Sequence, residues 1–199
     1  MDAITTTIKS DLARCVRDLY SLGLTSSVSG NHSVRAGKRS MWITPSEAPR
    51  YLLRAGDLVR MDLPTGRVFG RKKPSREHNM HRMIYNARSD VNTVVHTHSP
   101  YTIAVAISPA GFVHVIEEAK IVVGDPAIIE NRPSGSIELA EAVSAEFEKG
   151  ASAVVIKNHG VVAAGKSIHH ARAIVESLEE WAKILTVARL LGGPSGTLS

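Results

Sequence analysis

The sequence contains a single cysteine among its 199 residues. Cys15 cannot form a disulfide within the chain, and one thiol cannot build the closed, cysteine-rich site of a structural zinc. Cys15 also occupies an apolar position in a helical pattern, which predicts a packed and unreactive side chain. A metal site in this chain therefore has to be built from nitrogen and oxygen ligands.

Long apolar runs are also absent. No run approaches the roughly 20 residues that a membrane span needs. Residues 1–6 lack the basic start and the apolar centre of a signal peptide. We therefore expect a cytoplasmic protein that makes no contact with a membrane.

Aromatic residues make up only 5% of the chain, although its formal net charge is +5. The densest basic cluster, Arg71–Lys73 with Arg76, has no interleaved aromatic side chains on which bases stack in many nucleic-acid-binding proteins. We therefore expect no nucleic-acid partner. The excess of positive charge favours a solvated face, or the attraction of an anionic small substrate.

The order of the predicted elements indicates an α/β protein. The length favours one domain over residues 1–192, followed by a flexible tail over residues 193–199. Periodic apolar residues predict helices and strands in irregular alternation, and no Gly-x-Gly-x-x-Gly motif follows a strand. We therefore predict a three-layer α/β/α fold around a central, mainly antiparallel sheet.

The predicted elements have the following bounds. Helices are expected over residues 2–22, 101–107, 136–148 and 168–191, and from 74–77 to 87 with Ser75 as the N-cap. Strands are expected over residues 32–35, 40–44, 58–62, 67–70, 91–98, 153–157 and 161–164. Residues 112–123 are largely apolar yet carry Glu117 and Glu118, which indicates that one side of this segment faces a polar cavity.

Two histidines, His96 and His98, stand at the end of the predicted strand 91–98. Alternate residues of a strand share one face and lie about 6.6 Å apart between Cα atoms, so both imidazoles can reach one ion. His159 ends another predicted strand. Three neutral imidazoles with an open fourth position are typical of a catalytic zinc, for which Glu77 is the candidate fourth ligand or base. The alternative is that these histidines only make structural hydrogen bonds.

A second polar stretch surrounds Gly30 and Asn31. A Gly-Asn step among small and hydroxyl residues can turn backbone N–H groups and the Asn amide inward, as in loops that hold an anion. The alternative is a plain turn before a strand. His81 lies four residues after Glu77 and shares its helical face, either supporting the site or packed in the core.

Five short motifs follow one another along nearly the whole chain: Ser29–Arg35 (SGNHSVR), Ile43–Ser46 (ITPS), Lys73–Glu77 (KPSRE) with His81, His96–Pro100 (HTHSP) and Asn158–Gly160 (NHG). Each motif alone has little specificity. Together and in this order, they resemble the class II aldolase and adducin family. Adducin-type members, which are binding modules, lack the zinc histidines, and this chain has all three.

The resemblance implies where each functional group lies. It implies a Zn²⁺ ion held by His96, His98 and His159, with Glu77 as the acid/base and as a further ligand. It implies a homotetramer with sites between subunits. It also implies a pocket for a substrate phosphate, lined by Gly30, Asn31, Ser46, Ser75 and Arg76.

The resemblance further implies an aldolase. Such an enzyme would cleave a ketose 1-phosphate, either L-fuculose 1-phosphate-like or a 5-deoxypentulose phosphate, to dihydroxyacetone phosphate and an aldehyde through a zinc-stabilised enediolate. Glu77 would move the proton at carbon. Glu118, or Glu117, from this or a neighbouring subunit, would handle the proton of the cleaved hydroxyl. The alternatives are a methylthioribulose-phosphate dehydratase, a ribulose-phosphate 4-epimerase or a sugar-acid phosphate decarboxylase of the same family, or a non-catalytic binding protein.

The chain departs from the fuculose phosphate enzymes at several positions. Glu47 stands where they have glycine, and Ser75-Arg76 replaces a pair of serines. Their catalytic tyrosine has no counterpart in residues 112–119, where Glu117 and Glu118 occur instead. These differences leave the sugar and the fate of the cleaved bond open.

Overall fold

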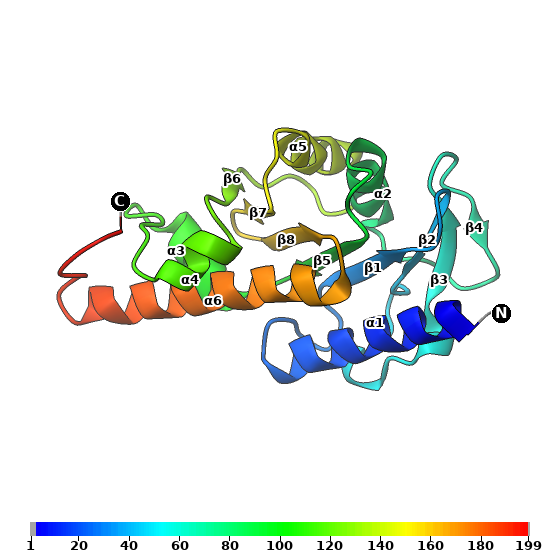
Figure 1. Cartoon of the computed structure of the whole chain (residues 1–199), viewed down its shortest axis with the longest axis horizontal. Helices are drawn as coiled ribbons and strands as arrows, with labels where there is room; N and C mark the ends of the chain where they lie inside the picture. The colour runs from blue at the N-terminus through cyan, green and yellow to red at the C-terminus, as the bar shows by residue number, and fades with distance from the viewer. Residues whose placement is uncertain (1–2, 199) are drawn as a thin grey trace.

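The computed structural model describes residues 3–198. Asp2, where a helix was predicted to begin, and the last tail residue, Ser199, lie outside the described residues. The described residues form a mixed sheet in the order β4-β3-β2-β1-β5-β8-β7-β6 (Figure 1). Every neighbouring pair is antiparallel except β6 with β7. The prediction of a mainly antiparallel sheet is thus confirmed.

The elements have these bounds. The strands are β1 (Asn31–Arg35), β2 (Ser40–Ile43), β3 (Val59–Asp62), β4 (Val68–Phe69), β5 (Thr93–Thr97), β6 (Ala127–Ile129), β7 (Ala153–Ile156) and β8 (Gly160–Gly165). The α-helices are α1 (Ala3–Ser21), α2 (His78–Ala87), α3 (Pro100–Ile107), α4 (Glu117–Val122), α5 (Ile137–Glu148) and α6 (Ile168–Leu190), and the short 3₁₀-helices are η1 (Arg50–Leu52) and η2 (Ala55–Asp57).

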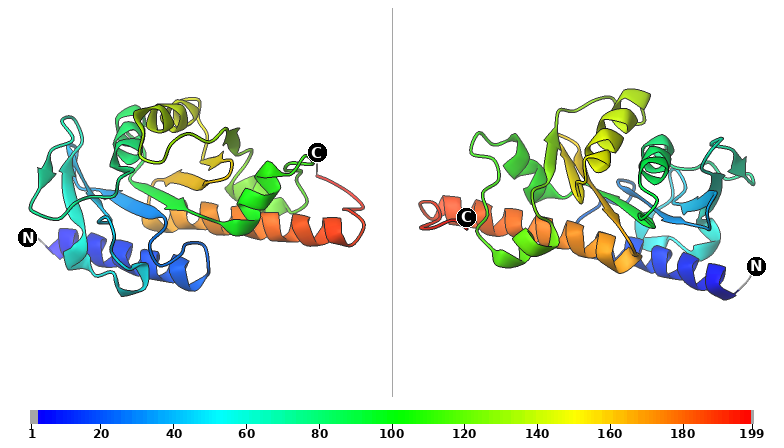
Figure 2. Two further views of the ribbon diagram at one scale, coloured as in Figure 1. Left: turned by 180° about the vertical axis from the view of Figure 1, so that it is seen from behind. Right: turned by 45° about the horizontal axis from the view of Figure 1, so that its top comes forward.

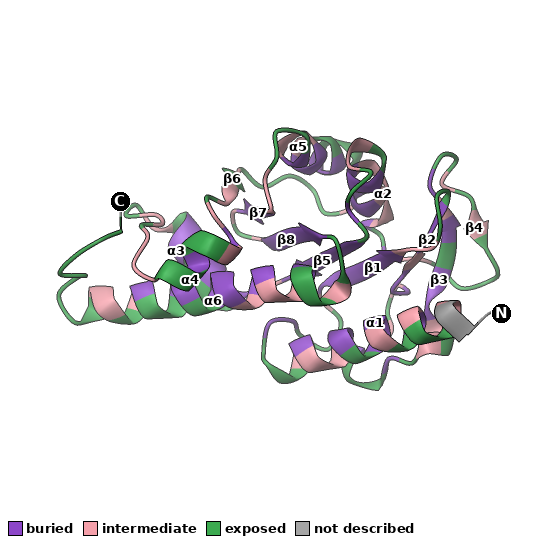
Figure 3. Ribbon diagram, in the orientation of Figure 1, coloured by how far each residue is buried: buried purple, intermediate pink, exposed green. Residues whose placement is uncertain are grey.

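Helices cover both faces of the sheet, which confirms the predicted three-layer α/β/α fold. Helices α2 and α5 lie together on one face, and α1 and α6 lie on the other, as the further views also show (Figure 2). The reason is visible in β5, where Val94 packs in the core under α2 and α5 while Val95 packs under α6. Both faces of this strand are buried (Figure 3), which explains its continuous apolar sequence.

Some local predictions need correction. Helix α2 begins at His78 with Glu77 at the N-cap position, so the prediction of Ser75 as the N-cap is wrong. Ser75 stabilises the turn before the helix instead, because its carbonyl accepts from His78 N–H. Strand β6 was not predicted, since three residues give too short a pattern, and residues 112–123 contain the helix α4.

No helix within residues 3–198 is long and apolar enough to cross a membrane. The end of the described chain turns back on the fold, because Leu198 N–H donates to the carbonyl of His114 at 2.8 Å.

Helix α3 is anchored directly after the two-histidine strand by one buried carboxylate. Glu179 of α6 accepts hydrogen bonds from the backbone N–H groups of Tyr101 and Thr102, at 3.1 and 2.8 Å. It also accepts from the Thr102 hydroxyl at 2.8 Å. These donors belong to the first turn of α3, whose N–H groups have no partner within the helix. Glu179 therefore fixes the chain just beyond β5.

We expect Glu179→Gln to lower the free energy of unfolding by about 1–3 kcal/mol, because the amide would turn an N–H group toward donors. Denaturant unfolding measures this loss. The control is Glu180→Gln on the exposed neighbour, which should change stability by less than about 0.5 kcal/mol. Equal effects of the two variants would contradict the role given to Glu179.

Candidate metal and anion site

The three predicted histidines converge at one end of the central strands. His96 lies in β5, His98 follows it directly, and His159 lies in the turn between β7 and β8. The ring centroids are 5.0, 5.0 and 5.2 Å apart, and one nitrogen of each ring lies within 4.8 Å of the others. Because β5 pairs with β8, the turn brings His159 beside the ends of β5. The predicted grouping is therefore present in the structure.

Glycine is required where this turn meets β5. A Cβ atom at Gly160 would collide with the carbonyl of Thr97 and would lie 3.0 Å from His96 Cε1. The preceding Asn158 has a positive φ of 57°, a conformation that asparagine tolerates better than most residues. The Asn-His-Gly sequence thus lets the turn approach the two-histidine strand closely.

The orientation of the His96 ring suits a cation ligand. Its Nδ1 lies 2.9 Å from the carbonyl of Val161, so Nδ1 carries the proton and the neutral ring has a bare Nε2. Nε2 is buried, has no hydrogen-bond partner in the described residues, and lies 3.3 Å from Glu77 Oε2. A bare nitrogen facing a carboxylate oxygen is unfavourable unless a cation binds both.

Burial keeps the other two histidines neutral. It lowers the pKa of His98 to about 3, with further lowering from His96 and His159. Burial also lowers the pKa of His159, with His96 adding to the effect. Neutral imidazoles are the form that binds a metal ion, so these side chains are ready ligands at neutral pH.

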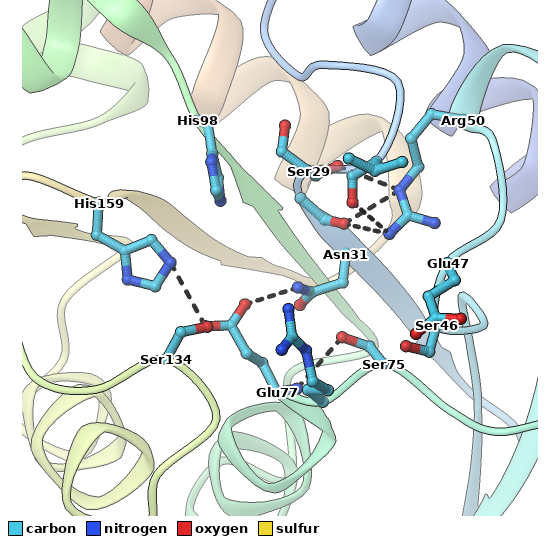
Figure 4. A pocket seen from close by; sticks show the side chains of 13 residues that line it. Ser29, Asn31, Ser46, Glu47, Arg50, Ser75, Glu77, His98, Ser134 and His159 are labelled. Carbon is cyan, nitrogen blue, oxygen red and sulfur yellow. Dashed lines mark hydrogen bonds and ion pairs between the residues drawn. The ribbon is translucent and has the colours of Figure 1, made fainter.

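Glu77 lies between the histidines and a set of hydrogen-bond donors (Figure 4). Its Oε2 accepts from Asn31 Nδ2 at 2.7 Å, and its Oε1 accepts from the Ser134 hydroxyl at 2.9 Å. His159 Nε2 lies 3.4 Å from Oε1. Burial by itself raises the pKa of Glu77, but the attraction of His96 and His159 in their protonated forms and the hydrogen bond from Asn31 outweigh burial and hold that pKa below its usual range. Glu77 is therefore ionised and held in one orientation.

A cleft with a volume of about 340 Å³ opens beside Glu77. All five residues predicted for a phosphate pocket line it: Gly30, Asn31, Ser46, Ser75 and Arg76. Three residues of the predicted metal site, Glu77, His98 and His159, also line the cleft. The remaining lining residues are Val28, Ser29, Glu47, Arg50 and Ser134. The Asn31 amide does turn inward as expected. The anion that it holds in the structure, however, is the carboxylate of Glu77.

Arg50 supplies a buried positive charge to this cleft. Its guanidinium donates to the carbonyls of Gly30, Pro45 and Ala48, with the shortest contact 2.7 Å to Gly30. Burial lowers the pKa of Arg50 to about 10, so the group stays charged at neutral pH. Carbonyl oxygens satisfy its donors without neutralising its charge. The cleft therefore favours an anionic ligand, and Arg50 clamps together the two loops that would surround it.

The predicted catalytic residue Glu118 lies elsewhere in this chain. It is exposed on α4, and its Oε1 accepts from the Ser177 hydroxyl of α6 at 3.3 Å. The adjacent Glu117 is exposed as well. Within one chain, neither carboxylate lines the cleft beside Glu77.

Arg50 and Ser134 are the site residues that sequence reasoning missed. Arg50 follows a proline at the start of the short helix η1, and its side chain donates to backbone carbonyls, among them those of the distant Ser29 and Gly30. Ser134 comes from the loop before α5. Neither position carries a periodic or motif signal, so the sequence offered no way to find them.

A three-layer fold with three convergent imidazoles and a carboxylate beside an anion-attracting cleft is typical of a metal-dependent enzyme that acts on an anionic substrate. The sequence model of the family described as "Class II Aldolase and Adducin N-terminal domain" matches residues 10–186. The chain therefore belongs to the class II aldolase and adducin family, and it is an enzyme of the aldolase class.

Similar proteins carry names consistent with this assignment. An L-fuculose phosphate aldolase from Methanocaldococcus jannaschii is 33% identical over 92% of this chain and 97% of its own length. A 5-methylthioribulose-1-phosphate/5-deoxyribulose-1-phosphate aldolase from Rhodospirillum rubrum is 33% identical over 88% of this chain and 79% of its own. A solved structure of an L-fuculose 1-phosphate aldolase superposes with a TM-score of 0.86 at 31% identity, over 98% of this chain and 91% of that one.

Glu47 is strained within the cleft. It has a positive φ of 61°, the left-handed region that favours glycine, and its side chain is exposed at the cleft. We expect Glu47→Gly to raise the free energy of unfolding by up to about 1 kcal/mol, because the strain is relieved. Loss of the negative charge should also tighten the binding of inorganic phosphate.

Glu47→Gln is the matched control, since it removes the charge but keeps the strain. Calorimetry should show tighter phosphate binding for both variants, and thermal unfolding should show greater stability for the glycine variant alone. Unchanged phosphate affinity in both variants would show that Glu47 does not act on the bound anion.

Proposed function

We propose that this protein is a zinc-dependent class II aldolase that cleaves a ketose 1-phosphate to dihydroxyacetone phosphate and an aldehyde. The observation that carries the proposal is the set of three imidazoles facing the ionised Glu77, directly beside the cleft that contains Arg50. The substrate class is either an L-fuculose 1-phosphate-like ketose or a 5-deoxypentulose phosphate. The names of the similar proteins support both choices.

The donor set suits zinc. His96, His98 and His159 would hold the ion, with Glu77 as a further ligand when substrate is absent, and no thiolate is nearby to favour a softer metal. When bound, zinc supplies a Lewis acid that polarises the substrate carbonyl. The buried Nε2 of His96 supports this assignment, because it has no hydrogen-bond partner in residues 3–198 and faces Glu77 Oε2 at 3.3 Å.

Glu77 is the group that moves a proton at carbon. In aldol addition, its carboxylate takes a proton from the carbon next to the carbonyl of dihydroxyacetone phosphate. In cleavage, the same group gives a proton back to that carbon. Asn31 and Ser134 hold one oxygen each, so the carboxylate needs little reorientation. A positioned base of this kind contributes roughly 10²–10⁴-fold to the rate.

The substrate phosphate would occupy the cleft between the two loops that Arg50 joins. Gly30 closes one loop at a positive φ of 69°, and a Cβ atom there would lie 2.7 Å from the carbonyl of His96. The close approach of this loop to β5 therefore needs glycine. Ser46, Ser75 and Arg76 complete the lining and provide further donors to a phosphate.

The proposal extends to the assembly. We place the enzyme in the cytoplasm as a homotetramer with sites between subunits, and its partner is the phosphorylated sugar. Glu118 would then act on the hydroxyl proton from a neighbouring subunit, since within one chain it lies on α4 outside the cleft.

The first test measures zinc by elemental analysis and follows dihydroxyacetone phosphate released from L-fuculose 1-phosphate and 5-deoxyribulose 1-phosphate. We expect about one zinc per chain and formation of that product. Zinc without the product would indicate the dehydratase, epimerase or decarboxylase reactions of the family. Protein that binds no zinc would contradict the three-histidine site.

Glu77→Gln should lower turnover by about 10²-fold or more, because the amide cannot accept the proton. Turnover is compared at equal zinc occupancy, so that a loss of metal does not imitate a loss of the base. Turnover within a factor of about 3 of the original enzyme would remove Glu77 from the proton transfer.

Glu118→Gln tests whether Glu118 takes part in catalysis at a site between subunits. We expect turnover to fall by about tenfold or more while zinc content is kept, because the lost group would act on substrate and not on the metal. Glu117→Gln is the matched control on the adjacent exposed residue. Equal turnover of the original enzyme and the Glu118 variant would exclude Glu118 from catalysis.

A further inference from the structure

A line of buried polar side chains runs from Glu77 into the core between β1 and α2. The Asn31 amide contacts Glu77, and Asn31 Oδ1 lies 2.6 Å from His81 Nε2. His81 Nδ1 lies 2.7 Å from the Ser33 hydroxyl, which lies 2.9 Å from the Tyr85 hydroxyl. All five side chains are buried. The histidine ligands do not need this line, so its presence calls for a separate explanation.

The donors and acceptors of this line can be assigned from its chemistry. The ionised Glu77 only accepts, so Asn31 turns its NH₂ group toward Glu77 and its carbonyl toward His81. His81 Nε2 must then carry a proton, which leaves Nδ1 bare in the neutral ring. The Ser33 hydroxyl donates to Nδ1 and in turn accepts from the Tyr85 hydroxyl. Every proton between Ser33 and Glu77 thus has one consistent position, whereas the Tyr85 hydroxyl also lies 3.5 Å from a second acceptor, the carbonyl of Asn92.

The neutral form of His81 agrees with its surroundings. Burial lowers the pKa of His81 to about 3, and the nearby His96 lowers it further, while Glu77 opposes both effects. A charged ring would have protons on both nitrogens and would force the Ser33 hydroxyl to accept at Nδ1.

We propose that His81 is a positioning residue, which locks the Asn31 amide with its NH₂ group toward Glu77 and thereby aligns the Glu77 carboxylate for proton transfer. The catalytic part of this inference rests on the proposed function, in which Glu77 moves the proton. An Asn side chain can rotate its amide by half a turn with little change in shape. The Glu77 carboxylate opposes that rotation from one side, because the rotated amide would turn its oxygen toward Oε2. The Nε2–H of His81 opposes it from the other side, because the rotated amide would place an N–H group against it.

The test compares His81→Gln with His81→Asn. The amide nitrogen of glutamine falls near the position of Nε2, so the glutamine variant keeps a donor to Asn31. The amide of asparagine falls near Nδ1, so the asparagine variant keeps only a partner for Ser33. Both variants remove the ring from the core and should lose similar stability, which makes them a matched pair.

We expect His81→Asn to lower kcat by about tenfold or more, with KM for the ketose phosphate within about twofold and zinc content unchanged. His81→Gln should recover kcat to within about threefold of the original enzyme. Tyr85→Phe, at the far end of the line, should leave kcat nearly unchanged, because Ser33 still donates to His81. Equal kcat for the glutamine and asparagine variants would overturn the proposal.

A spectroscopic measurement separates this inference from the proposed function. Nitrogen-15 NMR of imidazole-labelled protein, with and without zinc, should show His81 as the neutral tautomer protonated on Nε2. A proton on Nδ1 would overturn the inference even in an active enzyme. If the zinc-loaded protein cleaves neither ketose phosphate, the proposed function fails, while the Nε2–H tautomer would still support the locked amide.

Discussion

The approach of the Glu77 carboxylate to the buried imidazole of His96 and the partly buried imidazole of His159 is the constraint on which the rest of the site depends. Oε2 lies 3.3 Å from His96 Nε2, and Oε1 lies 3.4 Å from His159 Nε2. Such groups tolerate burial together only when donors hold the carboxylate and a cation can bind the free nitrogens. Asn31 and Ser134 provide the donors from two different segments of the chain.

The sheet meets this constraint through the pairing of β1, β5 and β8. Asn31 of β1 pairs with His96 of β5, which in turn pairs with Val162 of β8. A shift of one residue in either pairing would turn these side chains to the opposite face. The apolar side chains between the layers hold the register, since Val94 and Val95 are fully buried on opposite faces of β5. The packing of the core thus secures the geometry of the site.

The two loops around the cleft contain a buried positive charge and a residue in a strained backbone conformation. Arg50 keeps its charge among carbonyl oxygens and joins the loop at Gly30 to the loop at Pro45. Glu47 occupies a left-handed conformation in the second of these loops. A negative side chain at a strained position facing an anion-attracting cleft is a local conflict of the kind that concentrates at functional sites.

By itself, the sequence determined the layered fold and the pairing of His96 with His98, because the period of two in a strand is a local property. The five ordered motifs indicated that Glu77 and His159 join them. Only the tertiary structure decided that Arg50 and Ser134 enter the site. It also decided that the Asn31 amide donates to Glu77, and that Glu118 lies apart from the cleft of its own chain. These contacts join residues far apart in the sequence through one or two hydrogen bonds each, which leave no periodic trace along the chain.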